Sequence, residues 1–210
     1  ILGCGAGELL RSAVRAFTSK SAADVGAGPT FESPGEFAKF LGAQVKSVPV
    51  NAALGFDLDG MLAASRGAGL VYFCNPNNPT ATVVSKSDTL AFIEKLNRLS
   101  ADTTVMVDEA YFEYVADSSY GTVIPMAVQN PRLIVLRTMS KVFGMAGLRV
   151  GYAIGRADVM AKMKAWTLGS NVSQLSLVAA NAALQDKAHL DAEVKRNRES
   201  RTFTMKFFKD

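Results

Sequence analysis

Short and almost uninterrupted apolar runs, separated by segments of helical periodicity, constrain the fold of this chain most strongly. Three such runs cover residues 70–74, 103–107 and 132–136. None alternates polar with apolar residues, as a strand with one face in water would. Strands of this kind are buried on both faces, and helices between them are the usual connections in a parallel sheet. We therefore predict an α/β protein whose mostly parallel sheet carries helices on both faces.

The remaining pattern places further elements between these runs. Residues 6–17 and 34–42 have helical periodicity, and Asp57 and Ser85 are suitable N-caps for helices that end near 64 and 100. Asp88 follows Ser85 at the third helical position, which approximates a capping box. Two further strands are predicted over residues 44–50 and 150–154.

Composition excludes several classes of protein. Of the 210 residues 49% are hydrophobic, enough for one sizeable core, yet no apolar run approaches the ~20 residues of a membrane span. The first residues lack the basic and apolar regions of a secretory signal. Two cysteines and one histidine cannot build a disulfide framework or a Cys/His zinc site. We expect a cytoplasmic protein without a structural metal or a membrane partner.

The formal net charge of +4 comes from one end of the chain. Residues 195–210 hold six basic and two acidic residues, so the rest of the chain is neutral. A surplus confined to one terminal helix is typical of a solvated helix face. We therefore expect no nucleic-acid partner.

Polar segments follow the predicted strands where a parallel sheet usually binds its ligands. Residues 75–80 follow the first run, 108–111 the second, and 137–141 the third; Arg149 then enters the strand at 150–154. Each has an ordinary interpretation when taken alone. Asn-Pro-Asn-Asn-Pro is a rigid turn, and Asp108-Glu109 resembles the acidic strand of a nucleoside triphosphatase. The latter needs a phosphate loop, and no Gly-Lys dipeptide occurs in the chain.

A glycine-rich segment near the start of the chain suggests another class of site. Gly3-Cys4-Gly5-Ala6-Gly7 could belong to a dinucleotide fingerprint, which requires a strand immediately before it. We predict no strand there. The dinucleotide interpretation is therefore unsupported.

Together the segments resemble a known family. Asn-Pro-Asn-Asn-Pro-Thr (75–80), Asp-Glu-Ala-Tyr (108–111) and Thr-Met-Ser-Lys-Val-Phe-Gly-Met-Ala-Gly-Leu-Arg-Val-Gly (138–151) are similar, in this order, to motifs of the class I/II aminotransferases. These are fold-type I pyridoxal-phosphate enzymes, and the histidinol-phosphate aminotransferase branch is the most similar. The resemblance extends over nearly all 210 residues and implies that pyridoxal 5'-phosphate (PLP) is the cofactor.

The resemblance also implies roles for residues around the cofactor ring. Lys141 corresponds to the lysine that forms the Schiff base and then moves the proton between substrate and cofactor. Asp108 corresponds to the carboxylate that pairs with the pyridine nitrogen, which favours its protonated form. Asn78 and Tyr111 correspond to donors to the phenolate oxygen. Phe31 aligns with the aromatic residue stacked on the ring, although an ordinary core phenylalanine is the alternative.

The cofactor phosphate needs donors as well. By resemblance, Arg149 provides a charged fork, Thr138 and Ser140 provide hydroxyl groups, and the backbone N–H groups of Ala6 and Gly7 lie at a positive helix end. An acidic residue is common in the family at the position of Gly7, so its side-chain role is lost here.

The family pattern is also broken after the Asn-Pro-Asn-Asn-Pro-Thr motif. Ala81 replaces the usual glycine at this position. The replacement puts the turn geometry in question without touching Asn78.

We expect residues 1–210 to form the PLP-binding large domain, without the N-terminal arm and small C-terminal domain of the family. The latter provides the arginine that binds the substrate carboxylate. The resemblance implies a homodimer that transfers an amino group from a donor such as histidinol phosphate to a 2-oxo acid such as 2-oxoglutarate. The alternatives are an enzyme similar to threonine-phosphate decarboxylase, an aromatic aminotransferase, and a catalytically silent domain that binds a cofactor or partner.

Overall fold

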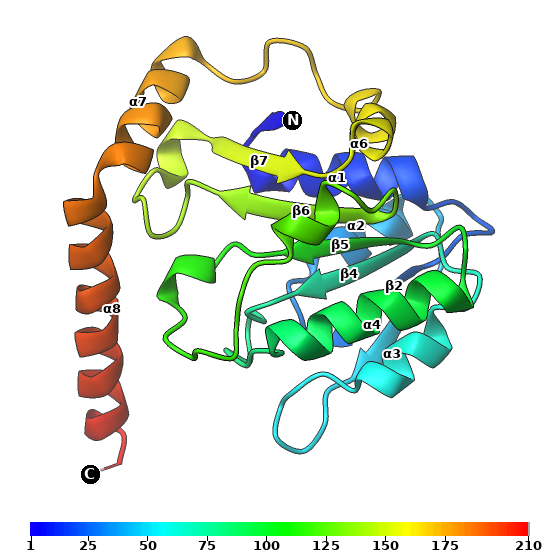
Figure 1. Cartoon of the computed structure of the whole chain (residues 1–210), viewed down its shortest axis with the longest axis horizontal. Coiled ribbons are helices and arrows are strands. Elements are labelled where there is room, and N and C mark those ends of the chain that lie inside the picture. Colours follow the sequence, from blue (N-terminus) through cyan, green and yellow to red (C-terminus); the bar gives the residue numbers. More distant parts are fainter. Residues whose placement is uncertain (210) are drawn as a thin grey trace.

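A seven-stranded sheet forms the centre of the computed structural model, which describes residues 1–209 (Figure 1). Its order is β1-β7-β6-β5-β4-β2-β3. The strands are β1 (Leu2–Cys4), β2 (Asp24–Gly28), β3 (Val45–Pro49), β4 (Leu70–Cys74), β5 (Thr104–Asp108), β6 (Leu133–Thr138) and β7 (Val150–Ile154). Neighbours from β3 to β6 pair in parallel, whereas β7 is antiparallel to both β6 and β1. The prediction of a mostly parallel sheet is confirmed.

Helices cover both faces of this sheet, as predicted (Figure 1). One core cluster joins the sheet to α1, α2 and α6, and a second joins its other face to α3, α4 and α5. The first group comprises α1 (Ala6–Phe17), α2 (Ser33–Phe40) and α6 (Ala157–Lys164). The second comprises α3 (Leu58–Ala64), α4 (Lys86–Leu99) and α5 (Ile124–Ala127).

The two covered faces explain the uninterrupted apolar strands. Tyr72 and Cys74 of β4 pack into the core cluster that includes α1 and α2, whereas Val71 and Phe73 pack into the cluster that includes α4. Successive strand residues point to opposite faces. A polar residue at any position of such a strand would therefore be buried. For this reason polar and apolar residues are not expected to alternate along it.

The predicted helix caps are present. Ser85 Oγ accepts a hydrogen bond from the Asp88 backbone N–H at 3.0 Å and donates to Asp88 Oδ2 at 2.7 Å. Asp57 Oδ1 accepts from the Gly60 N–H at 2.9 Å. Each side chain satisfies a backbone donor that the first helical turn leaves free.

The structure corrects the prediction that no strand precedes the glycine-rich segment. Residues 2–4 form β1 at the edge of the sheet, and Gly5, at φ 76°, turns the chain directly into α1. This strand has three residues and only one neighbour, β7, so its own sequence carries little pattern. Strand β2 was not predicted either, because three of its five residues, Asp24, Gly26 and Gly28, have low strand propensity.

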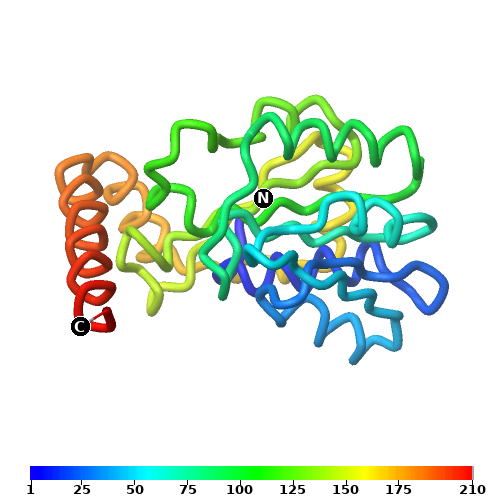
Figure 2. Tube along the Cα trace, turned by 90° about the horizontal axis from the view of Figure 1, so that it is seen from below, coloured from blue at the N-terminus to red at the C-terminus, as the bar shows by residue number. Residues whose placement is uncertain are grey.

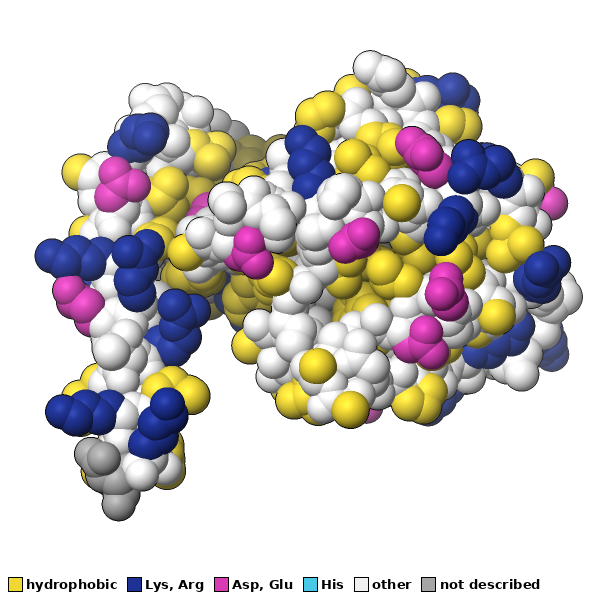
Figure 3. Space-filling view, turned by 60° about the horizontal axis from the view of Figure 1, so that its bottom comes forward, with side chains coloured by type: hydrophobic (Ala, Val, Ile, Leu, Met, Phe, Trp, Pro, Cys, Tyr) yellow, Lys and Arg dark blue, Asp and Glu magenta, His cyan; other side chains and the backbone are white. Residues whose placement is uncertain are grey.

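The last two helices lie outside the layered body. They are α7 (Gln174–Gln185) and α8 (Lys187–Phe207), and α8 stands apart from the sheet (Figures 1 and 2). Leu190 and Val194 attach the start of α8 to a small cluster around β7. The basic residues from 195 to 209 are exposed as predicted, but Phe203 and Phe207 are exposed with them (Figure 3). Asp210, counted in the charge balance, lies outside the described residues.

Candidate functional site

The polar segments that follow the strands lie along one edge of the sheet. Cys74 is opposite Asp108 in the register of β4 and β5, and Thr138 is opposite Gly151 in that of β6 and β7. Because β7 is antiparallel, its first residue, Val150, lies at the same edge and is paired with Cys4 at the end of β1. The start of α1 therefore meets the ends of β4, β5 and β6 at this edge.

Asp108 ends β5 and is buried, with 4% of its surface exposed. Tyr72 donates its phenolic hydrogen to Asp108 Oδ2 at 2.8 Å, and the Ala110 backbone N–H donates to Oδ1 at 3.1 Å. Burial raises the pKa of Asp108 to about 6, against the opposing effects of these donors and of the Lys141 charge. At neutral pH the carboxylate is therefore mostly ionised, which suits a partner that carries a positive charge.

Lys141, Tyr111 and Asn78 line one cavity of about 680 Å³. The Lys141 ammonium group lies 5.1 Å from the centre of the Tyr111 ring, and its charge acts on Asp108. The lysine side chain is exposed at this point, so its amine is accessible from the cavity. The structure thus brings three predicted residues together, and Asp108 lies close enough for the Lys141 charge to lower its pKa.

A second group of predicted residues surrounds the start of α1. Arg149 adopts a left-handed conformation, at φ 53°, and its guanidinium lies against Gly5, where an added β-carbon would stand 2.2 Å from Nη2. A β-carbon on Gly151 would stand 2.4 Å from the Ala6 nitrogen. Gly151 is thus needed for the close approach of β7 to α1, and Gly5 for the left-handed turn that leads into α1. This approach places a guanidinium beside the free N–H groups of a helix terminus, an arrangement that favours an anion.

Thr138 and Ser140 lie beside this terminus because Thr138 is paired with Gly151. Thr138 Oγ1 accepts a hydrogen bond from the Ser140 N–H at 3.1 Å, which forms a tight turn after β6. The hydroxyl and backbone donors predicted for a phosphate are therefore grouped at one place. A β-carbon on Gly7 would have no atom within 4 Å, so the missing acidic side chain leaves no packing defect.

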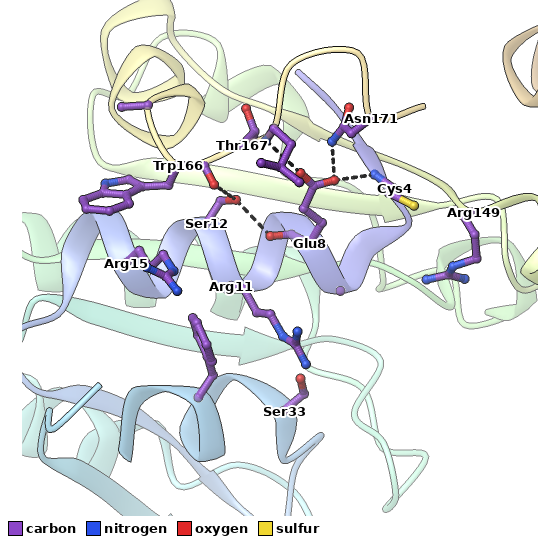
Figure 4. Close-up of a pocket in the computed structure, with 14 residues that line it drawn as sticks. Cys4, Glu8, Arg11, Ser12, Arg15, Ser33, Arg149, Trp166, Thr167 and Asn171 are labelled. Carbon is purple, nitrogen blue, oxygen red and sulfur yellow. Dashed lines mark hydrogen bonds between the residues drawn. The ribbon is translucent and has the colours of Figure 1, made fainter. Parts of the chain in front are cut away.

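A groove of about 900 Å³ extends from Gly7 and Arg149 along α1 (Figure 4). The segment after α6 forms one wall, and Glu8 holds it in place. Glu8 accepts from the Cys4 N–H at 2.6 Å, from the Leu168 N–H at 3.2 Å and from the Asn171 side chain. Sequence reasoning assigned no role to Glu8, because its partners lie up to 163 residues away.

Phe31 lines a groove that includes neither Lys141 nor Arg149. It is half-buried, packs against the core cluster of α1 and α2, and lines a groove of about 360 Å³ with Thr30 and Tyr72. It lines neither the cavity of Lys141 nor the groove of Arg149. The packing agrees with the alternative of a core phenylalanine, and the stacking role stays a prediction.

The polar groups behind the site were not predicted from the sequence. Tyr72 belongs to an apolar strand, and only the register of β4 and β5 shows that its hydroxyl reaches Asp108. Glu109 forms a buried ion pair with Arg137 at 2.7 Å, so its carboxylate already has a cationic partner. Burial raises the pKa of the Cys74 thiol to about 12, so this cysteine is a packing residue at neutral pH.

Among residues 1–209 no group of three His, Cys, Asp or Glu side chains could hold a metal ion. No helix in this part of the chain is long and apolar enough to cross a membrane.

The fold and these motifs define a class of protein. A family model described as "Aminotransferase class I and II" matches residues 1–210, and the chain belongs to this family. It is similar to histidinol-phosphate aminotransferases of Bacillus cytotoxicus, at 37% identity over 200 residues, and of Halalkalibacterium halodurans, at 40% over 200 residues. Each match covers 95% of this chain and 53% of the relative. The chain thus spans about half the length of these curated relatives.

Solved structures agree with this assignment. A protein from Erwinia carotovora atroseptica superposes with a TM-score of 0.92 at 34% identity, over 98% of this chain and 60% of that one. The histidinol-phosphate aminotransferase of Sinorhizobium meliloti, solved in complex with pyridoxal-5'-phosphate, superposes with a TM-score of 0.86 at 29% identity. This match covers 96% of this chain and 54% of that one.

Proposed function

We propose that the protein containing this chain is a PLP-dependent aminotransferase that uses histidinol phosphate or a closely related amino donor and a 2-oxo acid such as 2-oxoglutarate. The observation that carries the proposal is the arrangement of Lys141, Asp108 and Arg149 along one sheet edge in a chain 37% and 40% identical to histidinol-phosphate aminotransferases. The relatives support the substrate class. A homodimer in the cytoplasm, with residues 1–210 as its cofactor-binding domain, belongs to the same proposal.

The residues present fit PLP. Arg149, Thr138, Ser140 and the N–H groups of Ala6 and Gly7 provide cationic, hydroxyl and backbone donors for a phosphate dianion. The buried carboxylate of Asp108 can face a protonated ring nitrogen, and Asn78 and Tyr111 lie beside Lys141 to hold the ring oxygen. The residues around the ring do not suit a nucleotide base, because a base offers no aldehyde with which a lysine could react.

When bound, PLP supplies an electron sink for the electrons released at the substrate α-carbon. Lys141 would hold the cofactor covalently, and its amine, when free, would move a proton between the substrate α-carbon and the cofactor C4′. Asp108 keeps the proton on the ring nitrogen. Burial of this pair strengthens the attraction, since opposite charges interact more strongly away from water.

The proposal is tested with the complete protein, histidinol phosphate and 2-oxoglutarate. Formation of glutamate supports transamination, whereas release of CO₂ from threonine phosphate would identify a decarboxylase. Glutamate formed from phenylalanine or tyrosine alone would identify an aromatic aminotransferase. Cofactor binding without turnover of any donor would leave a silent domain.

A further inference from the structure

One hydrogen bond at the site comes from a residue that the proposed function leaves without a role. Tyr72 OH donates to Asp108 Oδ2 at 2.8 Å, and 2% of the tyrosine and 4% of the aspartate are exposed. The two residues lie on adjacent parallel strands, 36 positions apart in the chain. A phenylalanine at this position in the apolar run of β4 would bury its ring equally well. The hydroxyl of the tyrosine therefore needs an explanation.

The geometry limits how the carboxylate can rotate. Tyr72 binds Oδ2 from β4, and the Ala110 N–H binds Oδ1 from the chain after β5. With a different donor on each oxygen, rotation of the carboxylate plane breaks at least one hydrogen bond. The tyrosine ring is itself fixed, because it packs in the cluster that includes Leu10 and Met106.

The same hydrogen bond stabilises the charged form of Asp108. A buried carboxylate is costly unless donors replace the water that it has lost. Hydrogen bonds to charged groups are stronger than neutral ones, and an oxygen left without its donor carries the full desolvation penalty. Loss of the Tyr72 hydroxyl therefore favours a neutral Asp108, which attracts a protonated ring nitrogen less strongly.

We propose that Tyr72 is a positioning residue, which holds Asp108 ionised and oriented toward the nitrogen of a bound pyridine ring. This inference rests on the proposed function. Tyr72 acts through Asp108 and needs no contact with cofactor or substrate.

The test compares PLP with its 1-deaza analogue, in which a carbon replaces the ring nitrogen. Apoenzyme of the complete protein is titrated with each compound, and binding is followed by absorbance. We expect Tyr72→Phe to bind PLP about tenfold more weakly than the parent. The parent and variant should bind the deaza analogue within about twofold of one another, because the analogue offers no nitrogen to Asp108.

Tyr120→Phe is the matched control. Tyr120 also donates its hydroxyl hydrogen inside the fold, but to the Asn75 carbonyl oxygen, at 2.7 Å, and not to Asp108. This variant loses a comparable internal hydrogen bond, so its affinity for the two compounds should change by the same factor. A selective loss of PLP in Tyr120→Phe would overturn the inference.

Two further outcomes overturn it. Tyr72→Phe could bind PLP as tightly as the parent, or it could lose both compounds equally, as a variant with a general folding defect would. Failure of the proposed function gives a different result, since the parent protein itself would then not bind PLP through Lys141. The two failures are therefore distinguished by the parent titration alone.

Discussion

The guanidinium of Arg137 is held against the carboxylate of Glu109 behind the candidate site, with Nη2 and Nε at 2.7 Å and 2.8 Å from Oε2. Only 9% and 2% of the two side chains are exposed. Glu109 also accepts from Thr122 Oγ1 at 2.8 Å and from the Val123 N–H at 3.0 Å. The pair therefore joins the ends of β5 and β6 to the loop before α5.

Removal of one partner should destabilise the fold strongly. Arg137→Ala leaves the Glu109 carboxylate buried without its cation, and we expect a loss of about 3–5 kcal/mol in the free energy of unfolding. Urea denaturation measures this loss. The exposed pair of Arg156 and Asp158 is the control, and Arg156→Ala should cost less than about 1 kcal/mol. Equal losses in the two variants would show that burial of the inner pair has no energetic consequence.

The sequence predicted the elements that have a strong local pattern. It did not predict elements that are defined by contacts with distant parts of the chain. The buried runs gave β4, β5 and β6 within two residues of their observed ends, because both faces of each strand are apolar. The short β1 is defined by its pairing with β7, and the glycines of β2 conceal its strand character.

The same limit applies to the site. The motifs predicted Lys141 and Asp108 as site residues from their own neighbours in the chain. Tyr72 and Glu8 could not be identified in this way, because their partners are 36 and up to 163 positions away. Strand register is the information that was missing for Tyr72. A polar atom in a fully buried strand is the sequence signal that could have identified it.

Lys141 should be the residue that binds the cofactor covalently. It is exposed to the cavity shared with Asn78 and Tyr111. Borohydride reduction of the protein with PLP, followed by peptide mapping, should label Lys141. The exposed Lys95 on α4 lies outside this cavity and serves as an internal control. A label on any lysine other than Lys141 would remove the assignment.

Arg149 should determine the preference for a phosphorylated cofactor. Its guanidinium lies beside the N-terminus of α1, where it can add to the backbone donors. Arg149→Ala should weaken PLP binding by about 2–4 kcal/mol if the contact is bidentate. The variant should also bind pyridoxal and PLP with similar affinity, whereas the parent prefers PLP. Titration of both compounds tests this, and an unchanged preference would place the anchor elsewhere.

Ala81 stores backbone strain that a glycine would relieve. Its φ is 56°, which costs a residue with a β-carbon about 1–2 kcal/mol. Ala81→Gly removes this cost but adds about 0.4–1 kcal/mol of unfolded-state entropy. We expect a net gain of about 0.5–1 kcal/mol, measured by urea denaturation. Gly67 provides the reverse control: its φ is 68° with open space around it, so Gly67→Ala should destabilise through the backbone alone.

Asp24 should make the stability of the fold depend on pH. It begins β2 with 2% of its surface exposed, and within residues 1–209 its Oδ1 has no hydrogen-bond partner. Burial raises the pKa of Asp24 to about 7, whereas an unfolded aspartate titrates near pH 4. Between these values the folded chain binds more protons than the unfolded chain. The contribution of Asp24 to the stability of the fold is therefore fully present below about pH 4 and is lost as the pH rises through 7.

Asp24→Asn tests this contribution because an amide is neutral at every pH and has nearly the same shape as the protonated acid. At pH 8 the variant should be more stable than the parent by about 1–3 kcal/mol. The parent must either bury a charged carboxylate or bind a proton at a pH above the pKa of that carboxyl, and both cost free energy. The difference should shrink toward pH 5. Asp102→Asn, at an exposed position, should change stability by less than about 0.5 kcal/mol at either pH. If Asp24→Asn and its parent denature at the same urea concentration at pH 8, then Asp24 Oδ1 has a donor in solution, and the carboxylate is buried in its charged form without penalty.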